Sequence, residues 1–214
     1  MDLTVEWIIV RHGRTEWNVE RRYLGHSDIA LLPGEDAVLS QLALELHGLE
    51  FSAVYSSDLR RCTETLQRVR PDLMDKVRLD RRLREMDFGA WEGKIYDMLK
   101  DIPSYREWID HPEKNAPPGG ESWDHFSSRV SQFCADAMSA TLYSAGQSND
   151  TGNPASSKRP RVLIMTHGGV VRLLRTLLLP GVSFRDYQAE TGSLLRIPVQ
   201  VSSTRSGNEK HETS

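Results

Sequence analysis

The chain has 214 residues, 38% hydrophobic and 27% charged, a balance that suits one compact globular unit with a full core. Its net charge of −3 gives no overall positive field, so we expect no nucleic-acid partner. No apolar run reaches transmembrane length, and the first ten residues lack the regions of a signal peptide. Cys62 and Cys134 lie far apart without metal-binding spacing. We therefore expect reduced thiols, no membrane partner and a cytoplasmic location.

The first third of the chain predicts strands that alternate with helices. Residues 7–10 form a short apolar run typical of a strand buried on both faces. Apolar residues at helical spacing predict a helix over 34–47, which Gly48 would end. A second strand over 51–57 and a second helix over 58–71 follow. The inward positions of this second helix are Leu59, Cys62, Leu66 and Val69.

The middle of the chain is less regular. Residues 77–93 begin as a strand and break into a loop at Phe88. Proline and glycine recur over 103–120, which predicts irregular structure. Ser122 then caps a long helix. Its apolar stripe consists of Trp123, Phe126, Val130, Phe133 and Ala137.

The last third begins with a stretch, 144–160, that has no large apolar residue, and we expect a mobile surface loop there. Residues 161–166, "RVLIMT", predict the best strand of the protein. A helix follows that would end at Pro180, with Val170, Leu173, Leu174, Leu177 and Leu178 inward. A final strand over 193–199 precedes a polar tail, 202–214, that we expect to be disordered.

Strands alternating with helices predict an α/β fold with a mostly parallel central sheet between two helical layers. In such sheets, ligands bind outside the carboxyl ends of the strands. Three predicted strands end in unusual residues: Arg11-His12-Gly13, Ser56-Ser57 before Arg60-Arg61, and Thr166-His167-Gly168-Gly169. Two imidazoles, arginine forks and a helix N-terminus would thus meet at one edge. This combination is typical of a phosphate site, and glycine allows close backbone approach to the ligand.

These motifs carry a resemblance to a known family. "RHGRTEWN" resembles the signature of the histidine phosphatase (phosphoglycerate mutase-like) superfamily. The resemblance continues, in the family's order, through "YSSDLRRCTET", "LREMDFGAWEG", "PPGGES" and "VLIMTHGGVVRLL". It implies a single domain over 1–201, an α/β/α sandwich with a small capping region, about 94–121, over the carboxyl ends of the strands.

The resemblance also implies a role for each matching residue. His12 would be the nucleophile that forms a phosphohistidine, and Glu85 would protonate the leaving alkoxide. Glu121 in "PPGGES" would contact the substrate. The phosphoryl oxygens would be held by Arg11, Asn18, Arg60, His167 and the backbone of Gly168. No metal and no cofactor are expected, because arginines and a second imidazole would neutralise the phosphate.

Structural alternatives stand beside these roles. Glu85 lies in a charge run of a kind that is usually solvated, and Asn18 could simply cap a turn. We expect Arg61 to be a surface residue or one behind the site, because Arg60 is taken to match the family motif.

The expected activity is that of a phosphomonoesterase acting on a small metabolite, as a monomer or homodimer. Candidate substrates are α-ribazole 5'-phosphate, a sugar phosphate and phosphoglycerate. The capping region holds more acidic than basic residues, which favours a neutral or weakly charged leaving group. Phosphoglycerate mutase is the alternative enzyme, and a non-catalytic module that binds a phosphorylated ligand is the alternative of another class.

Overall fold

The computed structural model describes residues 2–34, 36–147 and 159–202. A five-stranded sheet has the order β3-β2-β4-β1-β5. The strands are β1 (Asp2–Arg11), β2 (Ala53–Ser56), β3 (Val77–Leu79), β4 (Arg161–Thr166) and β5 (Leu194–Ser202). The first four run parallel, and β5 pairs antiparallel with β1. The predicted mostly parallel sheet is confirmed.

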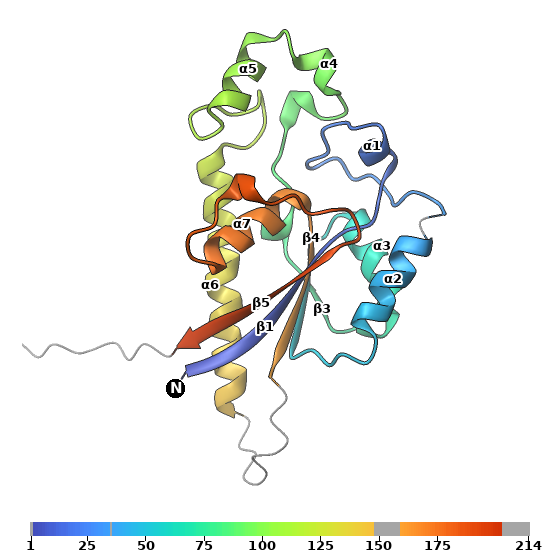
Figure 1. The fold of residues 1–214 in the computed structure, drawn as a ribbon, viewed down its shortest axis with the longest axis vertical. Coiled ribbons are helices and arrows are strands. Elements are labelled where there is room, and N and C mark those ends of the chain that lie inside the picture. The colour runs from blue at the N-terminus through green and yellow to red at the C-terminus, as the bar shows by residue number, and fades with distance from the viewer. Residues whose placement is uncertain (1, 35, 148–158, 203–214) are drawn as a thin grey trace, which may run out of the picture.

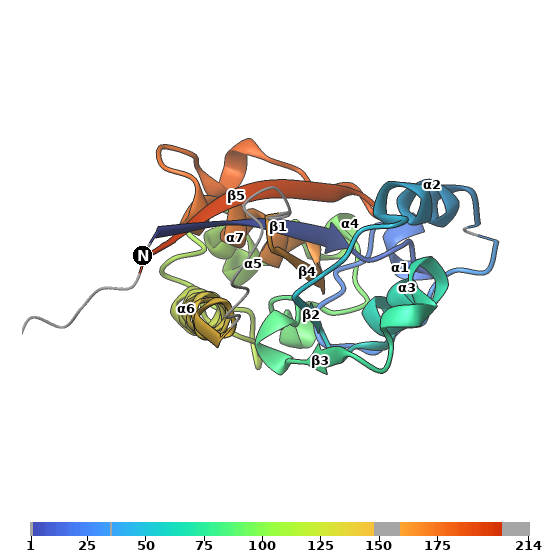
Figure 2. The same cartoon turned by 90° about the horizontal axis from the view of Figure 1, so that it is seen from below.

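Strand β1 shows why helices cover both faces of the sheet. Its apolar residues alternate, so that Trp7 and Ile9 belong to one buried cluster and Ile8 and Val10 to another. Helices α6 (Trp123–Gln147) and α7 (Gly168–Leu178) pack on the first face. Helices α2 (Asp36–Leu46) and α3 (Arg60–Val69) pack on the second. Figure 2 shows the resulting three layers, which confirm the predicted sandwich.

The capping region lies beyond the carboxyl ends of the parallel strands, at the top of Figure 1. It contains the short helices α4 (Tyr96–Leu99) and α5 (Pro103–Asp110) beside α1 (Glu16–Val19). The prediction of irregular structure over 103–120 is wrong for α5, because Pro103 stands at the first helical position, where proline is tolerated. Trp91, Leu99 and Tyr105 form a small core of their own there.

Other boundaries differ from the predictions. Strand β3 is only three residues long, and the chain continues as 3₁₀ turns η2 (Arg81–Leu83) and η3 (Gly89–Trp91). Further 3₁₀ turns are η1 (Pro71–Leu73) and η4 (Phe184–Asp186). Leu177 was expected to be buried but is 44% exposed.

The predicted mobile loop and the predicted disordered tail fall largely outside the described residues. Helix α6 continues to Gln147, four residues into the predicted loop 144–160, and residues 148–158 are not described. Strand β5 includes Ser202, and the rest of the predicted tail, 203–214, is not described. Among the helices of the described ranges, none is long and apolar enough to cross a membrane.

Candidate active site

Two buried histidines meet at the carboxyl ends of the neighbouring strands β1 and β4. His12 follows β1, and His167 caps the N-terminus of α7 directly after β4. The backbone N–H of His12 donates to the carbonyl of Thr166 (2.9 Å), which continues the pairing of the two strands. The ring centroids lie 5.1 Å apart with the planes at 62°. The sequence correctly predicts that these imidazoles come together.

The hydrogen bond of His12 fixes which nitrogen is free to react. Nδ1 lies 2.6 Å from the carbonyl oxygen of Gly13, and a carbonyl can only accept. Nδ1 therefore carries the proton, and Nε2 carries the lone pair. Burial lowers the pKa of His12 well below its ordinary value, and Arg61 and Arg11 lower it further. His12 is thus a neutral imidazole with a nucleophilic Nε2 at physiological pH.

His167 is held in the other tautomer. Arg61 donates from Nε to Nδ1 of His167 (3.1 Å), so the proton of a neutral His167 is on Nε2, which lies 2.9 Å from Oγ of Ser57. Burial, followed by the charge of Arg61, lowers the pKa of His167 well below the ordinary value. His167 therefore presents a neutral N–H donor.

The two neighbouring arginines of α3 require a correction. Arg60, the predicted phosphate ligand, has a 59% exposed side chain that pairs with Glu64 one turn along the helix (3.0 Å). Arg61 is completely buried, which excludes the first of its two expected roles, that of a surface residue. Besides His167, its guanidinium donates to the carbonyls of Ser27 (2.8 Å) and Gly25 (2.7 Å). The geometry places Arg61, and not Arg60, beside the histidines.

The sequence contained a signal for this choice. On a helix, position 61 shares a face with 62 and 65, whereas 60 lies outside that face. Cys62 and Thr65 are both fully buried. Thr65 also has a part that the sequence did not suggest, because its Oγ1 accepts from the backbone N–H of Gly13 (3.0 Å). The inner face of α3 thus holds the loop that follows β1 in place through a hydrogen bond.

Arg11 lies against the first turn of α7. A Cβ built on Gly168 would lie 3.3 Å from the Arg11 guanidinium carbon, so glycine allows this approach. Arg11 donates to the carbonyl of Ala189 (2.6 Å), and its buried Nε has no partner in the structure. A buried donor without a partner is costly, and an anion bound here would satisfy it. The positive end of the α7 helix dipole also lies beside the Arg11 guanidinium and would favour an anion there.

Asn18 has the structural role that was the alternative to phosphate binding: its side chain caps a turn. Its Oδ1 accepts from the backbone N–H (3.1 Å) and from the hydroxyl (3.0 Å) of Thr15, the N-cap of α1. The Asn18 backbone N–H in turn donates to the hydroxyl oxygen of Thr15, which completes a capping box. This leaves the Nδ2 amide of Asn18 as the polar group of the side chain available for a phosphate.

Glu85 points its carboxylate at the start of α7. Oε2 accepts from the backbone N–H of Gly169 (2.8 Å), and Oε1 accepts from that of Met86 (3.0 Å). A Cβ built on Gly169 would overlap the carboxylate, so this close approach requires glycine. Glu85 is therefore not part of a solvated charge run. It lies on the wall of the cavity described below.

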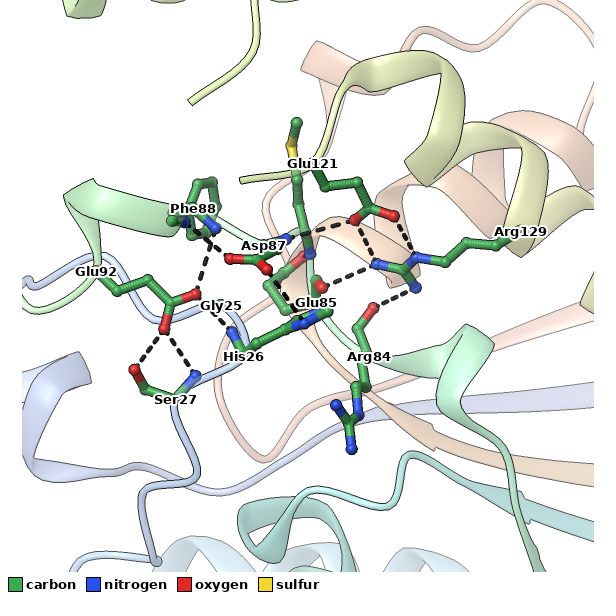
Figure 3. Close-up of polar contacts among 12 residues, drawn as sticks. Gly25, His26, Ser27, Arg84, Glu85, Asp87, Phe88, Glu92, Glu121 and Arg129 are labelled. Atoms are coloured by element: carbon green, nitrogen blue, oxygen red, sulfur yellow. Dashed lines mark hydrogen bonds and ion pairs between the residues drawn. The ribbon is translucent and has the colours of Figure 1, made fainter. Parts of the chain in front are cut away.

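Glu121 does not face that cavity. Its carboxylate pairs bidentately with Arg129 of α6 (2.7 and 2.8 Å), and its side chain is 13% exposed. The expected substrate contact is therefore not supported, and Figure 3 shows Glu121 turned toward Arg129. Within the described ranges, no three histidine, cysteine or carboxylate side chains form a group that could hold a metal ion.

A cavity of about 750 Å³ opens between the capping region and helices α6 and α7. Glu85, Gly169, Arg172 and Arg185 line it and also line a smaller cavity of about 370 Å³ beside Arg11. Arg172 lies over the ring of Phe184 (4.3 Å to the centroid). The aromatic side chains of the larger cavity are Tyr23, Phe88, Trp108, Trp123, Phe126 and Phe184. The site thus offers an aromatic surface with a cationic edge.

Comparison with known proteins places this geometry in a family. Residues 7–205 match the family model described as histidine phosphatase superfamily (branch 1). The adenosylcobalamin/alpha-ribazole phosphatase of Escherichia coli (strain K12) is 28% identical over 87% of this chain and 85% of its own length. The phosphoglycerate mutase-like protein 4 of Arabidopsis thaliana is 33% identical over 79% of this chain and 69% of its own.

A solved structure agrees with the sequence relatives. The alpha-ribazole phosphatase from Shigella flexneri superposes with a TM-score of 0.73 at 26% identity. The alignment covers 92% of this chain and 96% of that one. The buried histidine pair at the ends of β1 and β4 therefore belongs to a member of the histidine phosphatase superfamily, branch 1.

Proposed function

We propose that the protein is a phosphomonoesterase that works through a phosphohistidine on His12. The observation that carries the proposal is the tautomer of His12, which directs a free Nε2 lone pair into a site with buried cationic and N–H donors. In the first step Nε2 attacks phosphorus and the ester P–O bond breaks. Glu85 gives its proton to the leaving alkoxide, a poor leaving group without it. The products of this step are the alcohol and the phosphoenzyme.

In the second step a water molecule attacks phosphorus. Glu85 takes one proton of that water, the P–N bond breaks, and inorganic phosphate leaves with His12 restored. The phosphoryl oxygens would be held by Arg11, Arg61, His167, the Asn18 amide and the backbone N–H of Gly168. Arg61 here takes the role first given to Arg60. Fixed donors of this kind stabilise the charge that develops during phosphoryl transfer.

The aromatic cavity next to Glu85 suggests the kind of alcohol that leaves. Six aromatic rings line it, and flat ring systems pack well against such surfaces. Two of the relatives are named as acting on alpha-ribazole compounds. We therefore rank α-ribazole 5'-phosphate, whose leaving group carries a ring system, above a sugar phosphate.

A second candidate rests on the cationic edge of the cavity. Neither Arg172 nor Arg185 forms an ion pair with another described residue, and both line the cavity. Guanidinium groups without an ion-pair partner favour a substrate with a carboxylate, such as phosphoglycerate. The Arabidopsis relative is named a phosphoglycerate mutase-like protein. A phosphoglycerate mutase is therefore the runner-up.

One set of assays separates the two enzymes. Release of phosphate is measured for a panel of monoesters that includes α-ribazole 5'-phosphate, 3-phosphoglycerate and sugar phosphates, with and without a chelator. Isomerisation of 3-phosphoglycerate is measured alongside, primed with 2,3-bisphosphoglycerate. We expect hydrolysis to be insensitive to chelation and to exceed isomerisation. Faster isomerisation would reverse the choice, and no turnover of any ester would favour a non-catalytic binding module.

The remaining expectations are the cytoplasmic location, the lack of nucleic-acid and membrane partners, and the monomeric or homodimeric state. They stay predictions from the sequence. The same holds for the extent of the single domain, 1–201, and of its capping region, 94–121.

A further inference from the structure

The segment that carries Glu85 has little regular structure of its own. Residues 84–88 connect two 3₁₀ turns, η2 and η3, and belong to neither a helix nor a strand. Helix and sheet hydrogen bonds therefore do not fix the backbone of Glu85. The position of a proton donor must nevertheless be fixed closely, because it has to reach the leaving oxygen within hydrogen-bond distance.

Arg129 supplies the missing support from α6. Its Nη1 donates to the carbonyls of Arg82 and Arg84 (2.7 Å each), and its Nη2 donates to the carbonyl of Glu85 (2.9 Å). Its Nε and Nη2 also donate to the two oxygens of Glu121. These bonds use all five N–H donors of the guanidinium. A lysine, with three donors on one nitrogen, cannot reproduce this pattern.

Glu121 adds a second attachment to the same segment. Its backbone N–H donates to the carbonyl of Asp87 (2.9 Å), and its carboxylate lies 3.4 Å from the Asp87 backbone nitrogen. The Arg129 and Glu121 side chains are 17% and 13% exposed, so the ion pair is largely shielded from water. Figure 3 shows the pair on one side of the segment. Together they hold the backbone from residue 82 to residue 87.

The other side of the segment is tied to the loop at 25–27. Glu92 accepts from the backbone N–H groups of His26 (2.6 Å), Ser27 (2.7 Å) and Phe88 (3.3 Å). Figure 3 shows Glu92 opposite Arg129, with the Glu85 segment between them. Glu92 thus holds the segment at its last residue, Phe88, whereas the bonds to the carbonyls of Arg84 and Glu85 come from Arg129.

We infer that Arg129, held by Glu121, is a positioning residue that sets the Glu85 carboxyl against the N-terminus of α7. Arg129 lines neither of the two cavities described above, and it acts through the carbonyl of Glu85. The inference rests on the proposed role of Glu85 as the acid of the reaction. It also gives Glu121 a function that replaces the expected contact with the substrate.

The test exploits how strongly different leaving groups need a proton. An alkyl phosphate needs the acid, whereas p-nitrophenolate leaves almost without it. The quantity measured is kcat/KM. It depends only on the steps up to formation of the phosphohistidine, so the rate at which that intermediate is hydrolysed does not affect it. General acid catalysis raises the rate of such a step about 10²- to 10⁴-fold, so displacing the acid should lose part of this rate enhancement.

We expect Arg129→Lys and Glu121→Gln to lower kcat/KM for an alkyl phosphate at least about tenfold more than for p-nitrophenyl phosphate. The readout is the ratio of the two activities. A fraction of unfolded protein lowers both activities equally and leaves the ratio unchanged, so the test holds even where a variant is unstable.

Arg70→Lys is the matched control. Arg70 also donates to two carbonyls, those of Leu46 (2.8 Å) and Leu49 (3.0 Å), and pairs bidentately with Asp72. It follows the C-terminal end of α3, away from the strand ends that carry the histidines. Its substitution should leave the ratio of the two activities at the wild-type value.

Glu85→Gln distinguishes a failure of the positioning role of Arg129 from a failure of the acid role of Glu85. A ratio that changes for Glu85→Gln but not for Arg129→Lys and Glu121→Gln would overturn the positioning role and leave the proposed function intact. A ratio that does not change for Glu85→Gln would overturn the acid assignment itself, and the positioning role with it.

Discussion

Two adjacent arginines at the start of α3 have opposite environments. The Arg60 side chain is mostly exposed, while that of Arg61 is buried and reaches the second histidine. Both side chains carry the same charge, so their environments differ only because each side chain projects from a different face of the helix. Burial also lowers the pKa of Arg61, although nearby acidic groups oppose this. A guanidinium that is already desolvated interacts strongly with an incoming phosphate.

We therefore expect Arg61→Met to lower kcat/KM by roughly 10²-fold or more, the usual cost of one fixed donor to a developing charge. Arg60→Met should change kcat/KM less than about twofold, because exposed ion pairs contribute little. Steady-state kinetics with one phosphomonoester measures both, and circular dichroism at the assay temperature confirms that each variant is folded. Equal losses in the two variants would restore Arg60 as a ligand.

At the scale of elements, most of the fold follows from patterns in the sequence. The strand over 161–166, the long helix after Ser122 and the helix before Pro180 are confirmed because their apolar periodicity is clear. The histidines could be paired because carboxyl ends of parallel strands share one edge. Helix α5 was missed because Pro103, a residue that usually interrupts helices, occupies the first helical position. The contacts of Glu121 with Asp87 were missed because they depend on packing between distant segments rather than on local pattern.

The connection between α6 and β4 provides a test at this scale. Helix α6 ends, and strand β4 begins, at the end of the molecule opposite the capping region, at the bottom of Figure 1. Replacing residues 148–158 with a short flexible linker should therefore leave kcat/KM within about twofold. Shortening this connection should change the free energy of unfolding by about 1 kcal/mol. Phosphatase assays and urea denaturation check both values, and a tenfold loss of kcat/KM would show that this segment contributes to the site.

At the level of the whole molecule, the two histidines of the candidate site are buried as deeply as the hydrophobic core. His12 and His167 are 2% and 1% exposed, so folding must bury both imidazoles in their neutral form. The folded-state pKa of each is depressed, chiefly by burial. In the unfolded chain each histidine returns to a pKa of about 6.5. Below that pH the unfolded state binds protons that the folded state does not.

The sign of the pH dependence follows from this difference. The contribution of the two neutral histidines to the free energy of unfolding is fully present above pH 6.5. It falls as the pH is lowered, by about 1.4 kcal/mol per pH unit for each histidine well below pH 6.5. Urea denaturation between pH 7 and pH 5 should show this decline in the free energy of unfolding. His167→Asn should have a shallower slope, because one titrating group is gone. A wild-type free energy of unfolding that stays constant or rises toward pH 5 would contradict the conclusion that both buried histidines are neutral.

In the proposed mechanism, His12 carries the phosphoryl group during turnover. The most direct measurement is to mix the enzyme with a ³²P-labelled phosphomonoester, quench within milliseconds and locate the label by peptide mapping. We predict a label that is stable in base and labile in acid, on His12, and its loss in His12→Ala together with turnover. A label on any other residue, or a His12→Ala variant that retains a tenth of wild-type activity, would contradict the account.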